Sequence, residues 1–371
     1  MNVPVPTKSY ARQYGALWPS LAPVLERVFH DDEPLGGRAV TAFESAFAMR
    51  HGAEYRVVGT NSGTDAAVLV YRSLGLRAGD EVALSTHTFP GVASAIALAG
   101  LTPRWISPDP VTGRLTPEGV AEALGPKTRA VLAVHLYGHP EPIDALAEVC
   151  TARGVLLIED CAQAHGARWN ARPVGTFGQA AIYSFHPSKN LGAFGDAGCV
   201  VSRDTALIER IGTLGNLGRA GKYGFEHLGG VSRLDTLQAA LLHLKLEFLD
   251  DWNARRAAVA ARYLDALAGL PDLLLPSVDS RATPAWHLFV VRVPDRERFR
   301  AALAERGVST GMHYPVSALD QPAHAGRGVG ALGCAVSRVW AAQVVSLPLA
   351  HELTDLEVER VIDAVRAVRR R

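Results

Sequence analysis

Long hydrophobic runs and an excess of one charge are both missing from this 371-residue sequence. Its apolar stretches stay below the roughly 18 residues that a transmembrane helix needs, so the sequence predicts no membrane span. The 38 Lys and Arg residues balance 37 Asp and Glu residues, which leaves a net charge of +1. This balance argues against a nucleic acid polymer as the main binding partner. The hydrophobic share of 48% is typical of a soluble globular protein.

Cysteine is scarce, and the four residues Cys150, Cys161, Cys199 and Cys334 form no CxxC pair. We interpret them as reduced thiols. The opening stretch "MNVPVPTKSYARQYG" lacks the basic-then-apolar pattern of a signal peptide. Both observations favour a cytoplasmic protein. Cys161 and His165 have the spacing of a ligand pair on a helix, but two ligands alone are a weak metal signal, and we predict no metal.

Short apolar runs alternate with helical patterns through the first two thirds of the chain. Runs that are apolar throughout, rather than alternating, indicate strands covered on both faces. Six runs have this pattern: 80–85, 102–107, 129–135, 154–160, 180–185 and 197–202. Helical spacing appears between them at 63–74 and 142–153. The sequence therefore predicts a large, doubly wound α/β domain with a mostly parallel sheet over residues 1–248.

The pattern changes after this domain. Residues 234–267 have helical spacing and no glycine or proline, which predicts a long helix between two domains with a break near Asp250 and Asp251. A strand is predicted at 285–293, followed by helices at 296–307 and 356–368. We therefore expect a smaller C-terminal α+β domain over residues 249–371.

Small and hydroxylated residues stand where a predicted strand gives way to a helix. Ser62, Gly63 and Thr64 begin the helix predicted at 63–74. The amide groups in the first turn of a helix have no acceptor inside the helix, and together with the helix dipole they can bind a phosphate. A plain helix cap is the alternative interpretation of this motif.

Two carboxylates, Glu159 and Asp160, end the strand predicted at 154–160, and Gln163 follows. In open α/β sheets, ligands bind beyond the carboxyl ends of the strands, where a carboxylate can pair with a cationic ring nitrogen. Helix capping by Asp160 is the alternative.

A lysine follows the strand predicted at 180–185, in the stretch "YSFHPSKNLGAFGDAG". Lys189 at this strand end, with the carboxylate of Asp160 and the phosphate site at Ser62, matches the needs of pyridoxal 5′-phosphate (PLP). A lysine amine forms an imine with the cofactor's aldehyde, a carboxylate keeps the ring nitrogen protonated, and a helix N-terminus holds the phosphate. The three features together predict a PLP enzyme.

The sequence resembles the DegT/StrS family of PLP-dependent sugar aminotransferases, which have the aspartate-aminotransferase fold (PLP-dependent transferase fold type I). The resemblance rests on motifs that span nearly the whole chain in the family's order: "NSGTDAA" (61–67), "GDEVALSTHTF" (79–89), "VHLYG" (134–138), "IEDCAQAHGA" (158–167), "SFHPSKNLGAFGDAG" (184–198), "SRLDTLQAA" (232–240), "HYP" (313–315) and "SLPL" (346–349).

This resemblance implies roles for individual residues. Lys189 is implied to form the Schiff base, Asp160 to pair with the pyridine nitrogen, and Gln163 to touch the phenolic oxygen of the ring. Phe89 is implied to stack on the ring, where core packing is the alternative. The phosphate would be bound by Ser62, Gly63, Thr64 and Ser184. Substrate contacts are implied for His165, Arg233 and His313, with a structural histidine as the alternative at both His positions.

Two positions depart from the family pattern. Val231 stands where relatives carry an asparagine that reaches the cofactor phosphate of the partner subunit in a dimer, and valine cannot make that hydrogen bond. Ser317 and Leu319 replace the usual proline and histidine after "HYP". Because that region faces the substrate in relatives, the departure suggests an unusual acceptor.

The resemblance implies a homodimeric transaminase with active sites at the interface. L-Glutamate would reduce the cofactor to pyridoxamine phosphate, and a nucleotide-linked keto-deoxyhexose would then receive the amino group. The "KNLGAFGDAG" loop favours a dTDP-3-keto-6-deoxyhexose, in deoxyamino-sugar biosynthesis for antibiotics and related products. A 4-keto sugar or a keto-cyclitol is the alternative acceptor, and a non-catalytic PLP-binding regulatory protein is the alternative of another class.

Overall fold

The structure is a computed structural model that describes residues 4–331 and 334–369. Residues 1–3 of the opening stretch therefore lie outside the described part. The helices are α1 (Tyr10–Asp31), α2 (Arg38–Met49), α3 (Gly63–Ser73), α4 (Pro90–Leu98), α5 (Pro117–Ala123), η1 (Leu136–Gly138), α6 (Ile143–Arg153), α7 (Thr205–Gly215), α8 (Thr236–Leu246), α9 (Leu249–Ala266), α10 (Arg296–Ala304), η2 (Ala318–Asp320), η3 (Pro322–His324), α11 (Ala335–Gln343) and α12 (Asp355–Arg369). The strands are β1 (Arg56–Thr60), β2 (Glu81–Ser85), β3 (Thr102–Ile106), β4 (Thr128–Val134), β5 (Leu156–Asp160), β6 (Arg168–Trp169), β7 (Arg172–Pro173), β8 (Ala180–Ser184), β9 (Gly198–Ser202), β10 (Arg219–Ala220), β11 (Gly224–Phe225), β12 (Ala282–Thr283), β13 (Phe289–Arg292), β14 (Val329–Gly330) and β15 (Val344–Leu347).

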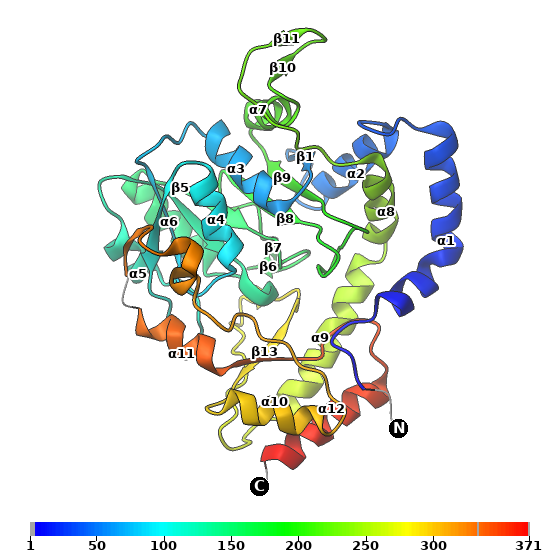
Figure 1. Cartoon of the computed structure of the whole chain (residues 1–371), viewed down its shortest axis with the longest axis vertical. Coiled ribbons are helices and arrows are strands. Elements are labelled where there is room, and N and C mark those ends of the chain that lie inside the picture. Colours follow the sequence, from blue (N-terminus) through cyan, green and yellow to red (C-terminus); the bar gives the residue numbers. More distant parts are fainter. Residues whose placement is uncertain (1–3, 332–333, 370–371) are drawn as a thin grey trace.

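An eight-stranded sheet forms the centre of the large domain, in the order β1-β9-β8-β5-β4-β2-β3-β14 (Figure 1). Its neighbours pair in parallel except at β9, which runs antiparallel to both β1 and β8. All six strands predicted from apolar runs are present, each within two residues of its predicted ends. The antiparallel return of β9 brings Gly198 opposite Ser184, so the loop that carries Lys189 begins and ends at the same edge of the sheet.

Helices cover both faces of this sheet, as the continuous apolar runs predicted. Buried residues of α3, α4 and α7 pack on one face, against strand residues such as Leu84, Leu132 and Ile182. Residues of α5 and α6 cover part of the other face, and α2 and α8 cover the rest. Because the buried strand residues alternate between these two layers, the doubly wound α/β class is confirmed.

The small domain packs α9, α10 and α12 against the antiparallel pair β13 and β15. The strand predicted at 285–293 is confined to Phe289–Arg292. The predicted long helix breaks at Glu247 and Phe248 rather than near residues 250–251. There the amides of both residues bond to carbonyls three residues earlier (3.3 and 3.1 Å), so the last turn of α8 tightens before α9 begins.

The hydrophobic cores cross the predicted domain boundary at two places. Val5, from the N-terminal segment, is fully buried in the core of the small domain, where it pairs with Val308. In the other direction, Ala318 packs into the large-domain core and β14 extends the large sheet beside β3. The first and last described residues, 4 and 369, both lie at the small domain (Figure 1). Within the described residues, no helix is long and apolar enough to cross a membrane.

Candidate active site

A cavity of about 460 Å³ lies beyond the carboxyl ends of β5 and β8, between the two domains. It is lined by eight of the eleven residues predicted for the site: Ser62, Gly63, Thr64, Phe89, Asp160, Ser184, Lys189 and His313. These residues come from positions far apart in the sequence. Their convergence follows from the parallel strands, whose carboxyl ends meet at one edge of the sheet.

The N-terminus of α3 forms one wall of the cavity. Ser62 caps the helix, and its hydroxyl accepts a hydrogen bond from Asp65 N (3.1 Å). The amides of Gly63 and Thr64 stand in the first turn, where a helix supplies no acceptor. Glycine is required twice here: a Cβ on Gly63 would lie 2.8 Å from Ser184 Cβ, and one on Gly198 would lie 2.4 Å from the Ser62 carbonyl carbon. The helix end is therefore held directly against β8 and β9.

Asp160 and Glu159 end β5 and point to different surroundings. Asp160 lines the cavity, and its Oδ1 accepts a hydrogen bond from Ala162 N (2.9 Å). Burial raises its pKa, while the charge of Lys189 opposes that shift. Glu159 is fully buried and accepts hydrogen bonds from three backbone amides between residues 175 and 178. Glu159 is thus a structural anchor of the strand end that presents Asp160.

Glu159, His135 and Cys161 lie close enough together to suggest a metal site. However, His135 Nδ1 accepts a hydrogen bond from Glu141 N (3.0 Å), so its Nε2 carries the proton and donates to Glu159 Oε2 (3.2 Å). Because the imidazole is committed on both nitrogens, this cluster is a hydrogen-bonded structural group. Cys161 and His165, the pair noted in the sequence, are both fully buried.

Lys189 lies in the loop between β8 and β9 and lines the cavity. Burial lowers the pKa of its amine to about 8, and the charge of Asp160 opposes the shift. The main chain of the loop is ordered around it, with Lys189 N donating to His186 O (2.8 Å). An amine with a pKa near neutrality can exchange protons and act as a nucleophile.

Phe89, at the N-terminus of α4, and Tyr314 supply aromatic rings to the cavity. Phe89 is 45% exposed as a residue, and the centroid of its ring lies 5.4 Å from that of Tyr314. Both rings line the cavity, so Phe89 is open to a ligand and is not a core residue.

Gln163 lies behind these rings and does not line the cavity. Its Nε2 donates to Tyr314 Oη (3.0 Å), and its Oε1 accepts from Tyr137 N (2.7 Å). The predicted contact of Gln163 with the cofactor ring would require it to leave or share the Tyr314 bond. The structure thus places Tyr314, which the sequence showed only as part of "HYP", between Gln163 and the cavity.

Of the three predicted substrate residues, only His313 lines the cavity. Its Nδ1 lies 2.7 Å from Ser346 Oγ, and burial lowers its pKa. His165 is fully buried, with its ring 5.4 Å from that of Tyr183, and burial lowers its pKa to about 3. This matches the structural alternative for His165 and leaves it no surface for a substrate.

Arg233 also lies outside the cavity lining and donates to Asn216 Oδ1 (3.1 Å). Its neighbour Ser232 bonds to Asn61 (3.1 Å), next to the capping Ser62. Val231, the first departure from the family pattern, is 59% exposed on the surface. Ser317, at the second departure, is buried, donates to Thr86 O (3.2 Å) and does not line the cavity.

The cavity also contains residues that sequence reasoning missed. His186, Asp196 and His287 line it together with Tyr314. His186 and Asp196 stand in the Lys189 motif, and a signal was therefore available. His287 comes from a strand-like run of the small domain, and no local pattern marks it as a site residue.

The residues present fit a bound PLP molecule. The volume of the cavity suits a small cofactor, and free amides at a helix N-terminus suit its phosphate. Asp160 suits a ring cation, because a positive neighbour stabilises the charged form of a buried carboxylate. Lys189 supplies the amine.

Comparison with known proteins identifies the family of the chain. The DegT/DnrJ/EryC1/StrS aminotransferase family profile matches residues 21–366. The dTDP-3-amino-3,4,6-trideoxy-alpha-D-glucose transaminase of Streptomyces venezuelae is 42% identical over 98% of this chain and 95% of its own length. The dTDP-3-amino-3,6-dideoxy-alpha-D-galactopyranose transaminase of Aneurinibacillus thermoaerophilus is 39% identical over 92% of this chain and 93% of its own. The erythromycin biosynthesis sensory transduction protein EryC1 of Saccharopolyspora erythraea is 40% identical over 98% and 99%.

Solved structures of aminotransferases also match this chain. S. venezuelae DesV in complex with a ketimine intermediate superposes with a TM-score of 0.97 at 42% identity, with both chains fully covered. NtdA from Bacillus subtilis with bound PMP has a TM-score of 0.92 at 26% identity and covers 100% of this chain and 86% of that one. The fold is therefore PLP-dependent transferase fold type I, and the protein is an aminotransferase whose cofactor is PLP. The chain belongs to the DegT/DnrJ/EryC1/StrS aminotransferase family.

Proposed function

We propose that this aminotransferase moves an amino group from L-glutamate to a dTDP-3-keto-6-deoxyhexose, with Lys189 as the residue that joins the cofactor. The observation that carries the proposal is the single cavity shared by Lys189, Asp160 and the N-terminus of α3. The relatives named above, two of which are 3-amino-sugar transaminases, support the choice of a 3-keto acceptor.

When bound, PLP supplies an aldehyde that forms an imine and a ring that takes up electrons from the reacting carbon. The residues of the chain do the rest. Lys189 Nζ takes and returns the proton at the reacting carbon, and its pKa of about 8 suits both directions. Asp160 holds a proton on the ring nitrogen, and the amides of Gly63 and Thr64 hold the phosphate.

Further residues orient the reactants. Phe89 supports one face of the ring. The hydroxyls of Ser62 and Ser184 assist at the phosphate. We keep Gln163 as a residue that positions the ring through Tyr314, to which it donates a hydrogen bond (3.0 Å). His313, which lines the cavity next to Tyr314, is the one predicted substrate residue that we retain.

The test of Lys189 is the visible absorption spectrum of the PLP-loaded protein before and after excess L-glutamate. The wild type should show the band of the lysine-bound cofactor, and glutamate should bleach it towards the pyridoxamine form. Lys189→Ala should lack the band, whereas Lys127→Ala, at an exposed lysine, should keep it. A wild-type band in the Lys189 variant contradicts the role of Lys189.

The acceptor can be tested on the bleached protein. A dTDP-3-keto-6-deoxyhexose should restore the band fastest, and the matching 4-keto sugar and a keto-cyclitol are the comparisons. Faster recovery with either of these replaces the proposed acceptor. A protein that holds PLP but does not respond to any amino donor would instead fit the regulatory alternative.

We also propose a homodimer in the cytoplasm. Support for the dimer comes from the hairpin of β10 and β11, which projects from the large domain beyond α7 (Figure 1). It and the following loop expose Tyr223, Phe225 and Leu228 by 82%, 61% and 97%, an unusual amount of apolar surface for a projecting segment. Light scattering should give twice the mass of one chain. The four free, buried cysteines support a reducing compartment.

A further inference from the structure

The loop that carries Lys189 is held from behind by two buried ammonium groups. Lys8 Nζ donates to Pro187 O (2.9 Å) and makes a longer contact with the carbonyl of Lys189 itself (3.4 Å). Lys245 Nζ, from α8, donates to Gly192 O and to Gln13 Oε1 (3.2 Å). Three main-chain carbonyls of this short loop thus accept from side-chain cations that stand outside the cavity lining.

It costs free energy to bury the ammonium groups of Lys8 and Lys245 so close to the amine of Lys189. Desolvation is the main cause that lowers the pKa of Lys8, to about 7, followed by repulsion from Arg256. Desolvation also lowers the pKa of Lys245, to about 8. The carboxylate that opposes these shifts is Glu352. Because hydrophobic residues would pack here at lower cost, the ammonium groups point to a specific task, which is the fixing of the loop carbonyls.

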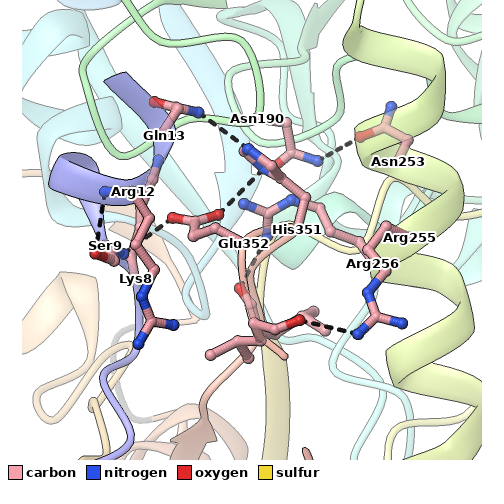
Figure 2. Close-up of polar contacts among 12 residues, drawn as sticks. Lys8, Ser9, Arg12, Gln13, Asn190, Asn253, Arg255, Arg256, His351 and Glu352 are labelled. Carbon is pink, nitrogen blue, oxygen red and sulfur yellow. Dashed lines mark hydrogen bonds and ion pairs between the residues drawn. The ribbon is translucent and has the colours of Figure 1, made fainter. Parts of the chain in front are cut away.

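Lys8 belongs to a segment that is fastened to the small domain on both sides of it. We call residues 5–13 the N-terminal strap. Val5 N donates to Gly307 O (2.8 Å), Ser9 N donates to Glu352 Oε1 (2.9 Å), and the Arg12 guanidinium pairs with both oxygens of Glu357 (2.8 and 2.9 Å). Figure 2 shows the strap on one side of the cluster, α9 on the other, and Glu352 with His351 between them.

The residue after Lys189 provides a second link to the same part of the molecule. Asn190 Nδ2 donates to Asn253 Oδ1 (2.9 Å) on α9 (Figure 2) and to Ala285 O (2.7 Å). Its Oδ1 lies 3.1 Å from Nδ1 of His287, which lines the cavity. The loop at 187–192 is therefore held in place by hydrogen bonds to the small domain as well as by its connections to the sheet.

We propose that Lys8 is a positioning residue for Lys189: the strap carries its ammonium from the small domain to the carbonyls of the catalytic loop and fixes the main chain beneath the reactive amine. The proposal rests on the proposed role of Lys189. Lys8 itself does not line the cavity.

Hydrogen–deuterium exchange of the PLP-loaded protein tests this inference, with Lys8→Met compared to the exposed control Lys127→Met. The amides of Lys189 and Ala193, which bond within the loop (2.8 and 2.7 Å), should exchange about tenfold faster or more in Lys8→Met, as for the loss of one charge-assisted hydrogen bond. Exchange in β4 should not change. In turnover, kcat should fall while KM for L-glutamate stays within about threefold, since bound substrate is not contacted.

The inference is overturned if the loop exchanges at the control rate, or if all segments of Lys8→Met speed up together, which would mean a general loss of stability. Should Lys8→Met not fold, Lys8→Gln retains an N–H donor without the charge. The loop amides of Lys8→Gln should exchange faster than those of the wild type but slower than unprotected amides. Loop exchange as slow as in the Lys127→Met control would also overturn the inference. A wild type without the lysine-bound cofactor band would instead defeat the proposed function, because loop exchange is measured independently of that band.

Discussion

A single methyl group at Gly198 should displace the helix end that we assign to the cofactor phosphate. A Cβ there would lie 2.4 Å from the carbonyl carbon of Ser62 and 2.6 Å from Gly63 N, whereas ordinary contacts begin at 3.4 Å. The first turn of α3 must therefore move by about 1 Å, because both atoms belong to the main chain and no side chain can rotate away.

Two measurements follow from this displacement in Gly198→Ala. Overpacking of this kind should lower the free energy of unfolding by about 1–3 kcal/mol. The amides of Gly63 and Thr64 move with the helix, so PLP affinity should fall about 10–100-fold, as for the loss of one charge-assisted hydrogen bond. Thermal unfolding of the apo protein and titration with PLP measure the two effects separately.

Gly212→Ala is the matched control. Its Cβ would lie 3.6 Å from Val58 Cγ2, an ordinary contact, and it stands inside α7. This variant should bind PLP like the wild type and gain up to about 1 kcal/mol of stability from helix propensity. If folded Gly198→Ala also binds PLP within twofold of the wild type, the N-terminus of α3 is not the phosphate site.

Two further predictions concern buried polar groups. Tyr314→Phe leaves Gln163 Nε2 without its acceptor and should lower the free energy of unfolding by about 1–3 kcal/mol, whereas Tyr10→Phe, at a 41% exposed ring, should leave the melting temperature unchanged; equal melting temperatures for both variants would contradict the Gln163 bond. Burial raises the pKa of Glu141 to about 8, opposed by the charge of Arg114. Its protonated form is therefore favoured in the folded state, so this contribution to stability is complete below about pH 4.5 and is lost as the pH rises to 8. Glu141→Gln should flatten the fall in chemical-denaturation stability over this window, and an unchanged slope would refute the assignment.

Local sequence patterns were sufficient for the features that depend on neighbours along the chain. The continuous apolar runs identified the central strands because both faces of each strand are buried. Asp160 was recognisable because it ends a strand, and Lys189 and Ser62 because they follow strands; parallel strands bring such positions together. Together these three positions indicated one cofactor, and the resemblance to a family then added the remaining site residues and the reaction.

Features set by distant contacts could not be predicted in the same way. The break of the long helix at Phe248 depends on how α8 and α9 pack on separate cores, and the sequence there contains no glycine or proline. Gln163 was expected at the cofactor, but its partner Tyr314 lies 151 positions away. His165 has the residue type of a site histidine, and only its full burial distinguishes it as structural.

The pairing of Val5 with Val308 has a consequence for the order of events during synthesis. A ribosome adding about 5–20 residues per second needs roughly 15–60 s to travel between these two positions. Strands β1 to β9 emerge within that interval and can assemble around their own core. Val5 is thus made long before its partner Val308, and Lys8, three residues after Val5, can support the Lys189 loop from the small domain only once that later partner has been made.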